Sequence, residues 1–287
     1  MNQASKPIDL PSSFRASREL TRHHARSFYF SSHTLPRQKR EAAYAIYSFC
    51  RYVDDSVDEA ADPSAISQVL DDLKQQIEAR RFNQAWGGAF LHTVEFYDIP
   101  WAYFYDLLTG VGMDQGHVRV QTWEELNRYC YHVASVVGLI MTHIFLKPSP
   151  EILAYAGDLG TAMQLTNILR DIAEDWERDR IYLPQEEMRQ YGVTESHIAD
   201  ALLDTHMREF LRFQIQRARD YYQRSEAGIR ALPRDGCQLT VWIMREIYAG
   251  ILEEIEKADL NIFRGRVHTT TFRKFQLALK AWRRCHS

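Results

Sequence analysis

The sequence predicts an all-α protein built as a single domain. Apolar residues recur at three- and four-residue spacing over long stretches, and alternating strand-like runs beside hairpin turns are hard to find. The 287 residues are 45% hydrophobic and 25% charged, which suffices for one large core. Because no repeat or low-complexity linker divides the chain, we expect one domain over residues 1–287, with residues 1–12 flexible.

Prolines set the order of the predicted helices. Pro36, Pro63 and Pro100 are each expected to open a helix, and Pro150 precedes another, because proline is tolerated in a first helical turn. The helices are predicted at residues 13–25, 37–60, 64–80, 84–97, 101–113, 122–146, 150–178, 205–230, 235–258 and 269–284.

Two segments are predicted as loops. Residues 179–191 mix charges, Pro184 and apolar side chains between two helices, which is typical of a loop beside a site. Residues 110–116 read GVGMDQG; the glycine spacing and the absence of a strand before it do not fit a dinucleotide-binding motif.

Charge and cysteine usage exclude some classes of protein. With 38 acidic and 35 basic side chains the net charge is −3, so general nucleic-acid binding has little electrostatic support. The four cysteines lack metal-ligand spacing and are expected to be free thiols in a reducing compartment.

The start of the chain lacks a secretory pattern, and the apolar run 136–146 is too short to span a bilayer. We therefore expect a cytoplasmic protein; peripheral contact with the inner face of the membrane and the oligomeric state stay open.

The first motif with chemical potential is Asp54-Asp55-Ser56-Val57-Asp58 on a strongly helical segment. Residues four apart in a helix share a face about 6 Å from each other, so Asp54 and Asp58 can bind a hard cation such as Mg²⁺. Arg51 adds a positive group to that face. Taken alone, such a motif is equally typical of a solvated acidic surface.

A second motif changes that balance. Gln164, Asn167, Asp171 and Asp175 step by three, four and four residues along one face of an otherwise apolar helix. Since Asn and Asp are poor interior helix formers, the stripe faces either water or a polar cavity. Two carboxylate pairs facing each other would hold Mg²⁺ and leave coordination positions free for diphosphate oxygens.

The chemistry that suits this arrangement is ionisation of an allylic diphosphate, in which cations neutralise the charge of the leaving group. Arginines can complete the clamp, because guanidinium groups bind phosphate in a bidentate manner. Two of four nearby arginines are expected to contact phosphate. The four are Arg51, Arg170, Arg178 and Arg180.

Several segments, taken together, resemble the squalene/phytoene synthase family in order and spacing. The similarity covers roughly residues 20 to 275. The segments are residues 24–28, 47–51, 54–58, 129–138, 164–175 and 178–184, and the runs 248–256 and 263–267 look most like bacterial phytoene synthases.

The resemblance implies the isoprenoid synthase fold, with helices around a central cavity. It implies Mg²⁺ as cofactor, with Mn²⁺ as a substitute, and these metal ligands: Asp54, Asp58, Asn167, Asp171 and Asp175. The implied catalytic residues are Asp54, Asp58, Asp171, Asp175, Tyr47, Arg51 and Tyr129. The implied substrate-binding residues are Ser27, Arg51, Gln164, Asn167, Arg170, Arg178 and Tyr248. A tyrosine at helical spacing is also commonly just a core residue with a satisfied hydroxyl group.

The resemblance also implies the reaction. Two identical prenyl diphosphates are joined into a cyclopropylcarbinyl diphosphate, which ionises again and rearranges to a 1-1′ linked product. Ser32 falls where shorter-chain members carry a large aromatic residue, and a small side chain there favours two geranylgeranyl diphosphates giving phytoene without NADPH. The alternative is a synthase that uses farnesyl diphosphate and makes squalene, dehydrosqualene or presqualene diphosphate.

Three other classes fit less well. A head-to-tail prenyltransferase or terpene cyclase also needs an aspartate-rich motif, but a cyclase typically pairs it with an Asn/Asp, Ser/Thr and Glu motif, from which Asn167-Ile-Leu-Arg-Asp171 departs. A non-catalytic assembly protein on the same fold does not need the aspartates, and this chain keeps all four. A carboxylate-bridged redox bundle would need Glu-x-x-His, which is missing near both acidic pairs.

Overall fold

The computed structural model describes residues 9–59, 63–114, 116–265 and 270–286, apart from the side chains of Asp58 and Pro63. It confirms the predicted all-α class. The helices are α1 (Leu10–His24), α2 (Arg26–Ser32), α3 (Arg37–Asp58), α4 (Pro63–Glu78), α5 (Gly87–Phe96), α6 (Ala102–Gly112), α7 (Trp123–Cys130), the π-helix η1 (Tyr131–Ser135), α8 (Val136–Phe145), α9 (Pro150–Glu177), α10 (Gln185–Gln190), α11 (Glu195–Ala199), α12 (Thr205–Ala231), α13 (Cys237–Lys257) and α14 (Thr271–His286). The strands within the described residues are β1 (Val118–Arg119) and β2 (Arg180–Ile181), which pair in parallel.

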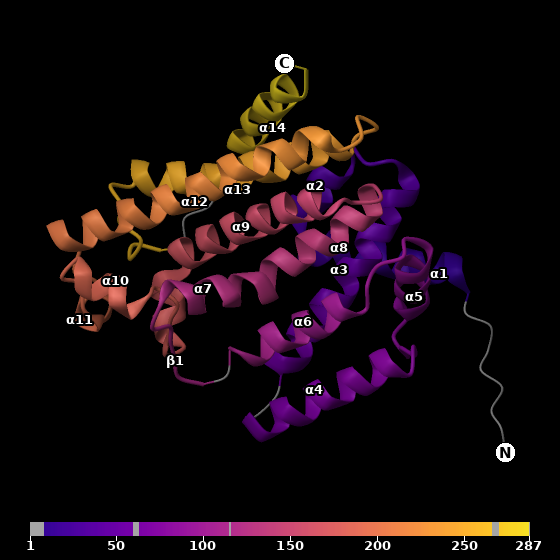
Figure 1. The fold of residues 1–287 in the computed structure, drawn as a ribbon, viewed down its shortest axis with the longest axis horizontal. Helices are drawn as coiled ribbons and strands as arrows, with labels where there is room; N and C mark the ends of the chain where they lie inside the picture. Colours follow the sequence, from indigo (N-terminus) through magenta and orange to yellow (C-terminus); the bar gives the residue numbers. More distant parts are fainter. Residues whose placement is uncertain (1–8, 60–62, 115, 266–269, 287) are drawn as a thin grey trace.

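The long helices α9, α12 and α13 pack together, with α14 lying on α13 at one edge and α4 at the opposite edge (Figure 1). Two large groups of buried apolar side chains hold this arrangement. One centres on α9, α12, α13 and the segment 181–198, and the other on α3, α5, α6 and α8.

Local sequence explains how α9 begins and how closely it packs. The Ser149 hydroxyl accepts a hydrogen bond from the Ile152 amide at 3.3 Å, and Pro150 occupies the first turn. Gly160 lets η1 approach, because an added Cβ would lie 2.4 Å from the Cα of Ser135. A π-helical turn, η1, interrupts the helix predicted at 122–146 where it contacts α9.

The structure corrects several expectations. Leu10–Ser12 form the start of α1, while residues 1–8 lie outside the described residues. Residues 179–191 are not simply a loop, since they contain β2 and α10. Residues 110–112 of the GVGMDQG segment are helical, because α6 continues to Gly112. The short elements α2, α10, α11, β1 and β2 were not predicted, because each is too short to show a period.

Within the described parts of the chain, no helix combines the length and the apolar character needed to cross a bilayer.

Candidate active site

A cavity of about 830 Å³ lies among α2, α3, α8, α9, α12 and α13, and η1 also lines it. Its character changes along α9. The first half of the helix contributes Ile152, Leu159 and Met163, and the second half contributes Gln164, Asn167 and Arg170. On α3 the lining likewise passes from Ala43 and Ile46 to Tyr47 and Cys50. The cavity thus has an apolar end and a polar end.

Each acidic motif begins one helical turn beyond the residues that line the polar end. Asp54 follows Cys50 by four residues on α3, and Asp171 follows Asn167 by four on α9. Residues four apart share a helix face, so both motifs continue faces that border the cavity. Asp58 belongs to the last turn of α3, but its side chain is outside the described part of the structure.

The second motif lies in a half-buried, strongly polar environment. The Arg170 Nε donates to Asp171 Oδ1 at 2.7 Å, and both side chains are at most 16% exposed. Burial, reinforced by the negative charge of Asp171, raises the pKa of Asp175 to about 7. Asn167 donates to Gln164 Oε1 at 3.3 Å, while its own buried Oδ1 accepts no hydrogen bond from the described residues.

These features fit a divalent cation. Asn167, Asp171 and Asp175 present oxygen ligands on one face of α9, and a cation there would satisfy the Asn167 Oδ1 and stabilise the Asp175 carboxylate. Among the described residues, no three His, Cys, Asp or Glu side chains gather closely enough to hold a metal ion. Mg²⁺ characteristically binds through one or two carboxylates, water and substrate phosphates.

The first motif is more open. Asp54 is exposed, and Arg51 forms its ion pair with Asp55, four residues on, each side chain being more than one-third exposed. The Arg51 Nε is buried and has no hydrogen-bond partner among the described residues. Tyr47 lines the cavity, and burial raises the pKa of its phenol to about 12, so the hydroxyl stays protonated at neutral pH.

Tyr129 does not line the cavity but joins a network that sequence reasoning missed. Its hydroxyl donates to Asp114 Oδ2 at 3.0 Å, and the Tyr182 hydroxyl donates to Asp114 Oδ1 at 2.7 Å. The two rings stack with their centroids 4.7 Å apart. The charge of Asp114 also helps to raise the pKa of Asp175, which places the network beside the second motif. The one sequence signal was an acidic residue inside the GVGMDQG segment.

The remaining predicted residues divide between the cavity and its surroundings. Ser27 and Tyr248 line the cavity. Ser27 Oγ accepts a hydrogen bond at 2.9 Å from Lys274 of α14, a cation that sequence reasoning also missed. Arg178 is exposed where α9 ends, and Arg180 on β2 has a buried Nε without a partner in the described structure. Both arginines lower the pKa of Asp175 and therefore lie close to it.

Ser32 does not have the place that the chain-length argument assigned to it. Its side chain is buried, lies 2.8 Å from the Tyr44 hydroxyl and is not part of the cavity lining. The apolar end is instead lined by Val137, Met141, Phe145, Ile152, Ala156 and Leu232. These side chains, unlike Ser32, face the space in which an apolar ligand could extend.

Several known proteins with similar sequences are phytoene synthases. The squalene/phytoene synthase family profile matches residues 21–273. The 15-cis-phytoene synthase of Synechocystis sp. is 34% identical, covering 98% of this chain and 88% of the relative. The phytoene synthase of Arthrospira platensis is also 34% identical, over 93% of this chain and 92% of the relative.

Solved structures show the same fold. A dehydrosqualene synthase in complex with a ligand superposes with a TM-score of 0.88 and 28% identity, covering 96% of this chain and 97% of that one. A squalene synthase from Alicyclobacillus acidocaldarius superposes with a TM-score of 0.80 and 27% identity, covering 90% of this chain and 98% of that one. The protein therefore belongs to the squalene/phytoene synthase family and is a prenyl-transferring enzyme with an all-α isoprenoid synthase fold.

Proposed function

We propose that the enzyme condenses two geranylgeranyl diphosphates head to head, through a cyclopropylcarbinyl diphosphate, to phytoene, with release of diphosphate. The observation that carries this proposal is the cavity, whose apolar lining runs along α9 and turns polar at Gln164, about two turns before Asp171. An apolar tail and a diphosphate head match these two ends. The near-full-length similarity to phytoene synthases supports the longer, C40 product.

In this proposal Asp54, Asp58, Asn167, Asp171 and Asp175 hold Mg²⁺, or Mn²⁺ in its place. The bound cations neutralise charge on the leaving diphosphate. Arg51, Arg170 and Arg178 orient the diphosphate oxygens by charge-assisted hydrogen bonds. Ser27, Gln164 and Tyr248 also line the cavity and position the substrate.

The tyrosines have separate tasks. Tyr47 lines the cavity as a neutral phenol, so its hydroxyl can donate to a diphosphate oxygen and its ring can face a carbocation. Tyr129 is held by Asp114 outside the cavity lining and acts through that network beside Asp175. No reductant takes part in the favoured reaction, so NADPH is not required.

A second candidate is condensation of farnesyl diphosphate. It is favoured by the close superposition on a dehydrosqualene synthase, whose name indicates a C30 product. The two candidates differ in the length of the prenyl chain that the apolar end accepts and share the polar site.

Product analysis separates the candidates. Purified protein is incubated with Mg²⁺ and either farnesyl or geranylgeranyl diphosphate, with and without NADPH, and the hydrocarbons are identified by mass. We expect a C40 hydrocarbon without NADPH. A C30 product alone would assign the enzyme to squalene or dehydrosqualene synthesis, and the absence of any coupled product would reject both candidates.

A further inference from the structure

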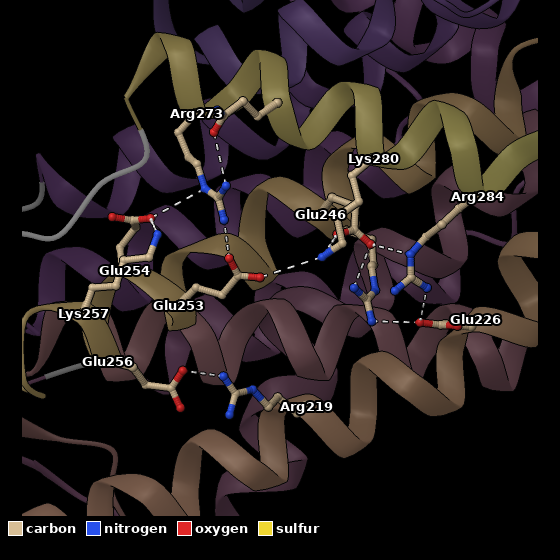
Figure 2. Close-up of polar contacts among 12 residues, drawn as sticks. Arg219, Glu226, Glu246, Glu253, Glu254, Glu256, Lys257, Arg273, Lys280 and Arg284 are labelled. Carbon is tan, nitrogen blue, oxygen red and sulfur yellow. Dashed lines mark hydrogen bonds and ion pairs between the residues drawn. The ribbon is translucent and has the colours of Figure 1, made fainter.

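Helix α14 docks onto the protein mainly through its charged face. Figure 2 shows Arg273, Lys280 and Arg284 pointing from α14 toward carboxylates of α13 and α12. Lys280 Nζ lies 2.8 Å from Glu246 Oε2, and Arg284 Nε lies 3.1 Å from Glu246 Oε1. Glu246 is only 1% exposed, whereas Lys280 is 46% exposed, so the carboxylate is buried and the lysine reaches it from the surface. The buried apolar side chains that α14 contributes to this contact are Leu277 and Ala281.

The opposite face of α14 is apolar and exposed. Phe272, Phe275, Leu279 and Trp282 follow each other at spacings of three, four and three residues and are between 49% and 73% exposed. Phe275 packs edge-on against Phe30 of α2, itself 37% exposed, with ring centroids 5.6 Å apart. We call these five side chains the outer stripe. In a water-soluble helix the apolar stripe ordinarily faces the core, so α14 is oriented the other way round.

Positive charge borders the outer stripe. Over Thr271–His286 there is no acidic residue. Arg283 is exposed, and no described residue forms an ion pair with it. Lys274 is close to the exposed Arg26 of α2, since burial and then the charge of Arg26 lower its pKa. Neither Lys274 nor Arg26 forms an ion pair with a described carboxylate.

We propose that the outer stripe docks on a membrane surface that contains anionic lipids, with its aromatic and leucine side chains inserted below the headgroups. Apolar side chains that include Phe and Trp, bordered by basic residues, are what an interfacial helix presents to such a surface. Anionic headgroups complement Arg26, Lys274 and Arg283. A symmetric contact between two copies of the chain would instead place the basic residues of one copy near those of the other, and like charges repel.

The outer stripe adjoins the wall of the cavity. Lys274 of α14 donates to Ser27 Oγ, and Ser27 and its neighbour Phe28 line the cavity. A docked α14 therefore holds this wall of the cavity against lipid, where a prenyl chain or a hydrocarbon product is soluble. This last consequence rests on the proposed function, whereas the docking itself rests on the surface alone.

Vesicle flotation of the full-length protein tests the docking with a matched pair of variants. Leu279 in the outer stripe is 50% exposed, and Leu202 between α11 and α12 is 49% exposed. We expect Leu279→Ser to weaken partitioning onto vesicles with an anionic lipid by about tenfold, since it removes one inserted side chain. Leu202→Ser should bind like the wild type. Arg283→Gln should lose about fivefold on anionic vesicles and nothing on zwitterionic ones.

Either of two results would overturn the proposal. The wild-type protein could float with neither type of vesicle, or Leu279→Ser and Leu202→Ser could weaken vesicle binding equally. Light scattering that shows a dimer which Leu279→Ser dissociates, without vesicle binding, would assign the stripe to a second copy of the chain. Turnover of detergent-dispersed substrate is measured in the same preparations. A C40 product without docking would reject only the docking, and docking without a coupled product would reject only the proposed function.

Discussion

The residues of the second acidic motif are held in a tighter environment than those of the first. Asp171 is paired with Arg170, Asp175 has its pKa raised to about 7, and Asn167 has an unsatisfied buried oxygen. The exposed Asp54 has no comparable burial. Without a bound cation the second motif therefore carries an electrostatic cost, which a divalent cation relieves.

Replacing a metal-binding aspartate should abolish most turnover without unfolding the protein. We expect Asp58→Asn and Asp175→Asn each to lower kcat by about 10²–10³-fold, because each removes charge that stabilises the leaving diphosphate through the metal. Glu177→Gln, on the exposed surface at the end of α9, is the control. Steady-state kinetics at saturating Mg²⁺ measures the effect, with circular dichroism as the check on folding. Near-normal turnover in either aspartate variant would contradict the site.

Variants of the two tyrosines bonded to Asp114 test whether Tyr129 has a functional or only a structural role. Tyr129→Phe and Tyr182→Phe each remove one hydrogen bond to the same carboxylate, so each should cost about 1–2 kcal/mol in the free energy of unfolding. Because Tyr129 is proposed to act through Asp114, which both phenols bond, each substitution should also lower kcat, by about tenfold. Wild-type kcat in both variants would leave the two tyrosines with a structural role only.

At the scale of elements, helix periodicity places the acidic motifs on the helix faces that line the cavity. Helices α3 and α9 each line the cavity with one face, and each carries its aspartates one turn beyond the lining on that face. The π-helical turn η1 packs against α9 at Gly160, and its Val133 and Ala134 line the cavity. Such turns are frequent at functional sites, because they shift side chains relative to a regular helix.

The attachment of α14 to α13 should depend on Glu246. This carboxylate is 1% exposed and pairs with Arg245, Lys280 and Arg284. We expect Glu246→Gln to lower the free energy of unfolding by about 3 kcal/mol, since it weakens three ion pairs, one of them with the largely buried Arg245. Glu256→Gln, which breaks an exposed pair with Arg219, should cost less than about 1 kcal/mol. Urea denaturation compares the two, and equal losses would show that Glu246 does not anchor α14.

At the scale of the whole molecule, the proposed function makes the cavity the place where the prenyl chains of the substrates bind. Along α9 its lining extends from Ile152 to Arg170, about 27 Å at the rise of an α-helix. Its apolar end is assembled from α8, α9 and the turn after α12, so substrate length depends on how these elements pack and on no single segment.

Narrowing the apolar end should change substrate preference. Ala156→Phe places a ring in the lining at the start of α9, and we expect turnover of geranylgeranyl diphosphate to fall at least tenfold while farnesyl diphosphate is still used. Ile152→Leu keeps the side-chain volume of a neighbouring lining residue and serves as the control. Competition between the two substrates, followed by product mass, measures the shift. An unchanged product ratio would place the length limit elsewhere.

Much of the fold and of the site was predictable because its signals are local. The helices at 37–60 and 150–178 were predicted within a few residues of α3 and α9, since long apolar periods and opening prolines mark them. The stripe from Gln164 to Asp175 lies on one helix, so its spacing alone predicted one polar face. The family resemblance rested on such segments, and the sequence comparisons confirm the family.

Only the tertiary structure decided which side chains from distant segments meet. Tyr182 reaches Asp114 across 68 positions, Lys274 reaches Ser27 across 247, and Ser32 is bonded to Tyr44 rather than exposed to the cavity. The outward orientation of the apolar face of α14 was equally invisible, because periodicity identifies a stripe but not the direction in which packing turns it. Local spacing follows from helix geometry, whereas these contacts follow from the packing of the whole chain.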